Sequence, residues 1–416
     1  MMKTNFEIGP IFSSLLKNKT GPLLVALQVA LSLAILVNAI YIVNLRLEVS
    51  ARPSGLSDEK HTFRLNISNQ KLGGHEDQIA MQKQEAAILR AVPGVVSVAR
   101  VNSFPVSRSG NMAGVAASRS QATVTTSAGQ YFTPDSLVKT WGLKLIEGRD
   151  FLPNEIVEID PNSNGGSTDV VIISLALAKK LFPNASSYVG KEFYQGTGDD
   201  ANALRIIGVV ETLQDSSATL NNQGELATIQ GVRLSNDPWS GYAVKTEPGQ
   251  RDRVMKDAES ALRKNSAQPL NIRMRTMEEF RTERYRGEKG LAYMLLAVCV
   301  LLLIITASGI VGMSALWVNQ RRKYIGVRRA LGARKIDIVR YFIIENAMII
   351  GFGIALGLLA ALGLNLILVD SFELPRLPLH YFYFAPFGFW LLGVLAVYWP
   401  ASKAASISPA TATRSV

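Results

Sequence analysis

The sequence predicts a membrane protein with four transmembrane α-helices and a large α+β extracytoplasmic domain inserted between the first and the second of them. Two observations support this fold class. Four apolar stretches each approach the roughly 20 residues that cross a bilayer core, and positive charge gathers around those stretches. Hydrophobic residues make up 48% of the 416 residues, which exceeds what an ordinary soluble protein needs.

The apolar stretches define the predicted spans, which we place at residues 23–45, 290–318, 343–369 and 382–400. The first follows Lys17 and Lys19, as a signal peptide follows its basic region. Its apolar run is about twice as long as that of a cleaved signal, and no small-residue cleavage site closes it before Arg46. We therefore expect the first stretch to remain as a membrane span.

A formal net charge of +11 is compatible with a nucleic-acid partner, but the positions of the charges along the chain argue against one. Residues 46–289 contain 30 basic and 28 acidic residues, which leaves 14 basic against 5 acidic in the rest of the chain. The basic excess therefore flanks the spans, where it indicates topology and contact with membrane lipids.

The loop at residues 319–342, between the second and third spans, carries most of this excess. Only Asp337 opposes its eight basic residues, which are Arg321, Arg322, Lys323, Arg328, Arg329, Arg334, Lys335 and Arg340. The positive-inside rule places this loop in the cytoplasm. Residues 370–381 have no such excess and form a short periplasmic loop. Both termini, including the tail at 401–416, are then cytoplasmic, and residues 46–289 lie outside.

Residues 1–22 precede the first span and are expected to be cytoplasmic. Their apolar residues recur at spacings near a helical period, which predicts an amphipathic helix on the inner leaflet. The alternative is that this segment extends the first span, and the sequence leaves both open. The residues concerned are Phe6, Ile8, Ile11, Phe12, Leu15 and Leu16.

The outer domain alternates β-rich and helical stretches. Alternation and turn signals predict strands at 63–67, 95–101, 170–173, 204–210 and 270–275, and helices at 78–91, 175–182 and 251–264. Residues 154–168, rich in Asn, Gly and Pro, predict an exposed loop or an insertion. The one cysteine, Cys299, falls in the second span, so this domain folds without a disulfide.

A capping-box pattern begins the helix that leads into the second span. Thr276 is followed three residues later by Glu279, the spacing that satisfies the first backbone N–H groups of a helix. We expect the charged start of this helix, residues 278–289, to stand above the membrane as a rigid stalk. Gly287 and Gly290 are positions that weaken it.

The cytoplasmic loop contains the most informative motif in the chain. From Arg321 it reads RRKYIGVRRALGARKIDIVRYFIIEN, which resembles the loop of MacB/FtsX-type ABC permeases, where an RRxxIGxRRALGA pattern forms the coupling helix. The ending LAVYWPASKAASISPATATR, from Leu395, is similar to the last span and tail of the same family.

The outer domain carries weaker similarities to the MacB-like periplasmic core. They are AVPGVVSV from Ala91, YFTPDSLVKTWGLKLIEGRDF from Tyr131, VVIISLALAKKLF from Val170 and RIIGVVETLQD from Arg205. Together with the loop and the tail, the resemblance extends over most of the chain.

The resemblance implies that the loop helix docks in a groove on a separate cytoplasmic ABC ATPase dimer. Arg328 and Arg329 would pair with acidic groups there, while Ile325, Val327 and Leu331 would fill its apolar part. The alternative for the arginines is contact with lipid phosphates. The expected ATPase-coupling residues are Ile325, Gly326, Val327, Arg328, Arg329, Ala330, Leu331, Gly332 and Ala333.

ATP is expected to bind a partner chain. The sequence lacks the GxxxxGK[ST] loop that would hold ATP phosphates, so we expect no cofactor in this chain. In MacB proteins an ATPase domain is fused ahead of the first span, whereas only about 20 residues occupy that place here. The resemblance further implies a second permease subunit, identical or related, a periplasmic adaptor, an outer-membrane channel and a place in the bacterial inner membrane.

Small residues recur at four-residue spacing in two spans. Gly353 and Gly357 form a GxxxG pair in the third span, and Ser308 and Gly312 have the same spacing in the second. Small residues let helices approach closely. The four positions indicate either an interface between two permease subunits or packing within one subunit.

No catalytic or metal site is predicted, so we expect a non-catalytic subunit. The three histidines fit no zinc pattern, and no serine lies in a GxSxG elbow. Glu345 begins the third span, where a carboxylate needs a partner, and Arg321, Arg322 or Arg340 could supply it. The spans offer no further acid for a proton relay, and the absence of polar residues lining them agrees with mechanical transmission rather than a pore.

The expected function is mechanotransmission, in which ATP-driven work in the cytoplasm reshapes the outer domain. Its first expected use is efflux or export of a drug, peptide or toxin. Relatives of the same fold extract lipoproteins or activate cell-wall hydrolases, and these remain alternatives. A further alternative is a membrane sensor whose outer domain binds a ligand.

Overall fold

The computed structural model describes residues 20–68, 73–160, 168–218, 222–235, 239–266, 268–372 and 375–406. The chain divides into two units, one made of Met1–Glu48 with Glu288–Val416 and the other of Val49–Gly287. The predicted amphipathic helix at 1–22 and the cytoplasmic tail at 401–416 lie mostly outside the described residues.

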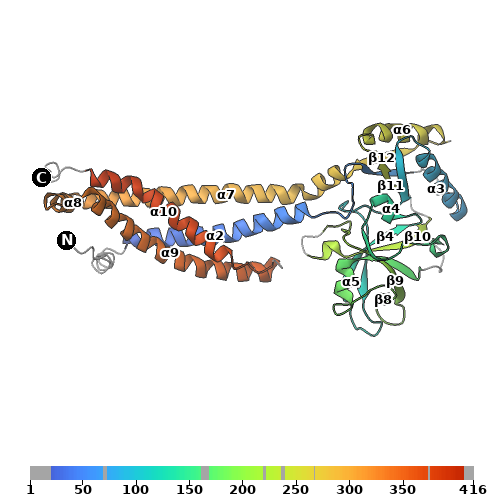
Figure 1. Ribbon diagram of the computed structural model, residues 1–416, viewed down its shortest axis with the longest axis horizontal. Coiled ribbons are helices and arrows are strands. Elements are labelled where there is room, and N and C mark those ends of the chain that lie inside the picture. Colours follow the sequence, from blue (N-terminus) through green and yellow to red (C-terminus); the bar gives the residue numbers. More distant parts are fainter. Residues whose placement is uncertain are drawn as a thin grey trace. The chain divides into compact units, whose positions relative to one another are not determined.

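Among the described residues, four helices are long and apolar enough to cross a membrane. They are α2 (Thr20–Ala51), α7 (Met277–Gln320), α9 (Lys335–Phe372) and α10 (Tyr381–Ala405). A short helix, α8 (Arg322–Ala330), lies between α7 and α9 in the chain, and α9 packs side by side with α10 (Figure 1). Each predicted span lies within one of the long helices, which extend beyond it at both ends.

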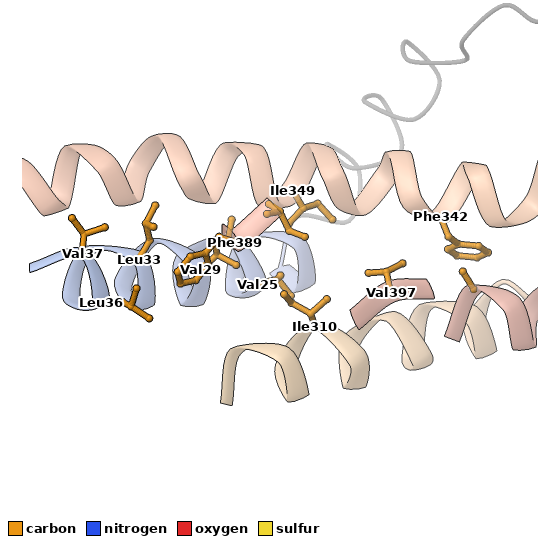
Figure 2. Packing of buried hydrophobic residues seen from close by; sticks show 14 of the residues in the cluster. Val25, Val29, Leu33, Leu36, Val37, Ile310, Phe342, Ile349, Phe389 and Val397 are labelled. Carbon is orange, nitrogen blue, oxygen red and sulfur yellow. The ribbon is translucent and has the colours of Figure 1, made fainter. Parts of the chain in front are cut away.

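The core of the helical unit is arranged around α2, the most buried of the four long helices. Val25, Val29, Leu33 and Val37 recur every four residues and so form one buried stripe. Figure 2 shows this stripe with side chains that α7, α9 and α10 contribute to the same cluster, among them Ile310, Ile349, Phe389 and Val397. All four helices therefore share one apolar core.

The glycine pair of α9 packs against α2 of the same chain. A Cβ atom at Gly353 would lie 2.7 Å from the carbonyl oxygen of Ala26, and one at Gly357 would lie 2.9 Å from that of Ala30. These two glycines therefore serve packing within one chain. Ser308 and Gly312 are exposed on α7, and their use between two subunits remains a prediction.

Buried polar side chains join the long helices, so the prediction that the spans lack them is wrong. Asn38 of α2 donates to the carbonyl of Ala361 in α9 at 3.1 Å, and Thr306 of α7 donates to Ser32 of α2 at 2.8 Å. Ser314 of α7 donates to Asn346 of α9 at 3.3 Å. These groups bond to one another, as polar residues do where water is absent.

The described residues of the other unit form two sheets. The smaller is fully antiparallel, in the order β12 (Asn271–Thr276), β1 (Thr62–Ser68), β11 (Trp239–Thr246) and β2 (Val95–Arg100). Helices α3 (His75–Arg90) and α6 (Arg251–Lys264) pack against the same face of it (Figure 1). Phe63, Leu65 and Ile67 alternate along β1 and pack with residues of both helices in one core.

The larger sheet follows the order β4, β3, β8, β9, β7, β10 and β6, and β5 pairs with β9. An additional parallel pairing of β4 with β10 closes six of these strands into a ring, which leaves fewer open edges. The strands are β3 (Asn111–Ala116), β4 (Thr126–Thr133), β5 (Leu145–Gly148), β6 (Val157–Ile159), β7 (Val170–Ser174), β8 (Glu192–Gln195), β9 (Asn202–Val210) and β10 (Ala227–Leu234).

Short helical segments connect these strands. They are α4 (Leu137–Trp141), α5 (Leu175–Leu181) and the 3₁₀ turns η1 (Pro153–Glu155) and η2 (Asn222–Glu225). Ser136 caps α4 by accepting the N–H of Lys139 at 2.9 Å, and Gly142 ends that helix at φ 62°. Trp141 of α4 is buried with Tyr131 and Phe104 in a second core.

The predicted strands and helices of this unit are confirmed, with two corrections. The predicted loop at 154–168 contains strand β6, which pairs in parallel with β10, while residues 161–167 lie outside the described part. The predicted stalk does not stand clear of the domain at its start, because Met277, Phe280 and Tyr285 of α7 are buried in the second core. The capping box is present, with Thr276 N–H donating to Glu279 at 2.8 Å and Glu279 N–H donating to Thr276 at 3.2 Å.

A buried acid lies in the connection after β9. Asp215 is fully buried, and its Oδ1 accepts the N–H of Ala218 at 2.5 Å. Burial raises the pKa of the Asp215 carboxyl to about 6, although backbone N–H groups and the Arg284 charge act in the opposite direction. Tyr131 and Tyr285 also face this carboxyl.

The packing of the glycine pair of α9 against α2 can be tested by substitution. Gly353→Ala should lower the midpoint of thermal unfolding of the full chain in detergent, because its Cβ meets backbone atoms of α2; overpacking of this kind costs about 1–3 kcal/mol. Gly351→Ala is the control, since a Cβ there meets nothing within 4 Å, and it should leave the midpoint unchanged or raise it. Equal midpoints for the two variants would contradict this packing.

The raised pKa of Asp215 predicts that the stability of the folded chain depends on pH. Because its folded-state pKa lies above the ordinary 3.8, the folded chain binds this proton more tightly, and stability falls as pH rises from about 4 to 6, by about 3 kcal/mol in all. Asp215→Asn should therefore gain about 2–3 kcal/mol relative to wild type between pH 4.5 and 7.5, measured by denaturant unfolding in detergent. The exposed Asp199→Asn is the control. A wild-type pH dependence in Asp215→Asn would refute the prediction.

Candidate functional site

The candidate site is the connection between α7 and α9, which holds α8. Gly332, at φ 96°, follows the end of α8 in a backbone conformation that other residues rarely adopt. The N–H of Arg334 then donates to Asp337 at 2.9 Å, which caps the start of α9. The turn between the two helices is thus set by local sequence.

A buried ion pair fixes the start of α8 to α9. Arg321 Nη1 donates to both carboxylate oxygens of Glu345, at 2.8 and 2.7 Å. Glu345 has no exposed surface, and a buried carboxylate is costly unless it is paired. The prediction of a structural partner for Glu345 is confirmed, and the partner is Arg321.

Two further arginines bind within the chain. The guanidinium of Arg328 lies over the rings of Tyr324 and Tyr341, at 4.8 and 5.2 Å from their centres. Arg329 donates to the backbone carbonyl of Ala405 at the end of α10. Ile325 is buried against the same side. One side of α8 is therefore anchored to α9 and α10, around a small pocket lined by Arg321, Tyr324, Ile325, Arg328, Ile338, Tyr341 and Phe342.

Apolar side chains within and just after α8 are exposed to the surroundings. Val327 is 50% exposed, Leu331 is 83% exposed, and Ile336 at the start of α9 is 66% exposed. We call these three residues the apolar strip. Exposed basic residues flank it, namely Arg322, Lys323, Arg334 and Lys335. A strip of this kind suits an apolar groove with an acidic rim on another protein.

The structure divides the predicted coupling residues into two groups. Val327, Ala330, Leu331 and Gly332 are exposed. The others are buried or half-buried, and are Ile325, Gly326, Arg328, Arg329 and Ala333. Sequence reasoning did not assign Ile336 to the site, although an apolar residue directly after Arg334 and Lys335 was a signal for it. The bond from Arg329 to Ala405 had no sequence signal, because 76 residues separate the two.

We find no metal site among the described residues. No group of three or more His, Cys, Asp or Glu side chains there could hold a metal ion. His61 lies beside Asp58, with Nδ1 2.7 Å from a carboxylate oxygen, and His75 lies beside Ser235 at 2.7 Å.

Comparison with known families agrees with this architecture. The four long apolar helices and the inserted α+β unit define a multi-pass membrane permease with a periplasmic domain. The model of the MacB-like periplasmic core domain matches residues 29–261, more than half of the chain, and that of the FtsX-like permease C-terminal domain matches residues 296–409. The chain belongs to the MacB/FtsX-like permease family and is a multi-pass protein of the bacterial inner membrane.

Curated relatives carry the name macrolide export ATP-binding/permease protein MacB. The Agrobacterium fabrum protein is 25% identical over 227 residues, which cover 54% of this chain and 33% of that protein. The Escherichia coli K12 protein is 26% identical over 359 residues, which cover 81% of this chain and 48% of that protein. The chain thus spans about half or less of the length of these relatives.

A solved structure shows limited similarity. The periplasmic region of MacB from Actinobacillus actinomycetemcomitans aligns with 57% of this chain and 97% of its own length, at 16% identity and a TM-score of 0.34.

The Arg321–Glu345 pair generates a prediction about α8. Glu345→Gln removes the charge that holds Arg321, and loss of one partner of a buried pair costs up to about 3–5 kcal/mol. Since Arg321 is 25% exposed, we expect the loss of stability to be smaller than this. Without the pair, α8 should open locally more often, so trypsin should cleave within α8 about tenfold faster, measured on the full chain in detergent. The exposed Asp370→Asn, on the same helix as Glu345, serves as the control for a lost acidic charge. Unchanged cleavage within α8 in Glu345→Gln would show that the pair does not anchor this helix.

Proposed function

We propose that this chain is the permease subunit of a MacB-type ABC transporter. It couples ATP hydrolysis by a separate cytoplasmic ATPase dimer to conformational change in its periplasmic domain. Two permease subunits, identical or related, bind that dimer. The work done outside is efflux or export of a drug, peptide or toxin, together with a periplasmic adaptor and an outer-membrane channel. The name of the curated relatives, which specifies macrolide export, supports this choice of cargo class.

The observation that carries the proposal is the two-sided character of α8. The apolar strip and its basic rim face outward, while Arg321 and Arg329 bind to α9 and α10 on the other side. A partner that seats on the strip can therefore displace α8 together with the helices to which it is bonded. ATPase closure is a source of such displacement.

We propose different roles for the exposed and the buried members of the predicted coupling residues. Val327 and Leu331 contact the ATPase directly, because their side chains are exposed. Arg328 and Arg329 act by holding α8 in position, because they already bind aromatic rings and a carbonyl within the chain. Replacing the arginines together with Leu331 would mix these two effects, so the exposed residues provide the cleaner test.

The proposal predicts that Val327→Ser combined with Leu331→Ser weakens ATPase association at least about tenfold, because two apolar side chains lose contacts worth about 1.5–3 kcal/mol each when fully buried. The measurement is the amount of an ATPase with a phosphate-loop sequence that co-purifies with the full chain, and its turnover in membranes. Leu359→Ser is the control, since Leu359 is exposed on α9 within the third span. Unchanged association and turnover would refute docking through the strip.

The same purification separates this proposal from its rivals. A membrane sensor neither binds a stoichiometric ATPase nor changes its turnover. Lipoprotein extraction and hydrolase activation also need the ATPase, so they differ only in the periplasmic partner that co-purifies with the complex.

A further inference from the structure

The first turns of α7 are part of the folded core of the unit at residues 49–287. Met277, Phe280 and Tyr285 are buried there. The ring of Phe280 lies 5.6 Å from that of Phe104, centre to centre. A helix embedded in this way cannot shift relative to its unit without disturbing packed side chains.

Two arginines one turn apart on α7 bind different segments of the same unit. Arg281 Nε and Nη2 each donate to the Glu59 carboxylate at 2.7 Å, and Nη2 also donates to the carbonyl of Arg52 at 2.8 Å. Burial alone would raise the pKa of Glu59, but hydrogen bonds from Arg281 and Ser54 hold it below its ordinary value. Arg281 thereby ties α7 to the segment that follows α2.

Arg284 binds the connection after β9. Its Nε donates to the carbonyl of Ser217 at 2.8 Å, and its Nη2 donates to the carbonyl of Ala218 at 2.8 Å. The two donors are fixed by the planar guanidinium, so they hold two successive peptide carbonyls in one orientation.

The backbone that Arg284 holds is strained. Ala218 has φ 45°, and the neighbouring segment contains Val106 at φ 63° and Arg108 at φ 62°. A non-glycine residue in this region costs about 1–3 kcal/mol, and such strain persists only where surroundings enforce it. The two segments bind each other through their backbones. The N–H of Val106 donates to the backbone carbonyl of Asp215 at 3.1 Å, and the N–H of Arg108 donates to that of Ser216 at 2.7 Å.

These segments lie beside strands of the larger sheet. Residues 104–109 directly precede β3, and residues 214–218 follow β9. We name them together the strained pair. Ser217 also donates to the sulfur of Met112 in β3 at 3.7 Å. A change in the strained pair would therefore alter the start of β3.

We propose that Arg284 is the positioning residue through which displacement of α7 changes the conformation of the periplasmic domain. Arg284 holds the strained pair while α7 is in one position, and withdrawal of its guanidinium lets residues 214–218 and 104–109 relax. Strain that Arg284 helps to maintain, together with the backbone hydrogen bonds between the two segments, gives a two-state element. This role rests on the proposed function, which supplies the displacement.

The first experiment tests the contact without any partner. Hydrogen exchange of the full chain in detergent is compared for Arg284→Ala and for Arg286→Ala, an exposed arginine two residues further along α7. Arg284→Ala should speed exchange at the amides of Val106, Arg108 and Ala218 at least about tenfold, because two charge-assisted hydrogen bonds are lost. Arg286→Ala should leave it unchanged. Equal exchange in both variants overturns the proposal.

The second experiment tests transmission, in the complex with the co-purified ATPase. In wild type, ATP with vanadate should change exchange both in α8 and in residues 104–109, whereas in Arg284→Ala only α8 should respond. A response of residues 104–109 that survives in Arg284→Ala overturns the role of Arg284 alone. A wild-type complex in which α8 itself does not respond overturns the proposed function, and the role of Arg284 with it.

Discussion

The unbroken backbone of α7 is the constraint on which the rest of the structure depends. This helix runs from Met277 to Gln320, so it begins within the core of one unit and ends at the coupling connection of the other. Within a bilayer each backbone N–H and C=O must be bonded inside the protein, which a helix achieves alone. Gly287 and Gly290 lower helix propensity but do not interrupt it. The helix is therefore continuous from residue 277 to residue 320.

The helical unit combines close packing with selective polar contacts. In lipid, burial of apolar side chains contributes little to the association of helices. Two other features therefore specify which helices meet: the close approach of helices at Gly353 and Gly357, and hydrogen bonds such as that of Asn38. The Arg321–Glu345 pair extends this principle to the membrane boundary. The apolar strip is exposed and takes no part in these contacts, and the proposed function assigns the partner to it.

Much of this architecture could be predicted from the sequence because its signals are local or compositional. Length and hydropathy located the four long apolar helices, and the Thr276–Glu279 pattern located the start of α7. The cytoplasmic side of the basic loop remains a prediction from charge. The ring closure of β4 with β10 could not be predicted, because it joins residues about 100 positions apart. Strand β6 was missed, since Asn, Gly and Pro around it dominated the pattern.

The candidate site was predicted in part for the same reason. The motif identified the residues of the candidate site, but not which of them are exposed and which are buried. That depends on where α9 and α10 pack, as the hydrogen bond from Arg329 to the carbonyl of Ala405 illustrates. The strained pair had no sequence signal at all, since Val106, Arg108 and Ala218 are residue types that normally avoid positive φ.

Labelling with a membrane-impermeant maleimide tests the central claim most directly, namely that α7 connects a periplasmic unit to a cytoplasmic coupling helix. In a Cys299→Ser background, cells would express a variant with a single cysteine, either Ser260→Cys in α6 or Leu331→Cys directly after α8. Both positions are exposed. The account predicts labelling of residue 260 in cells whose inner membrane is intact but whose outer membrane is permeabilised, and of residue 331 only after the inner membrane is opened. Labelling of both residues from the same side would contradict it.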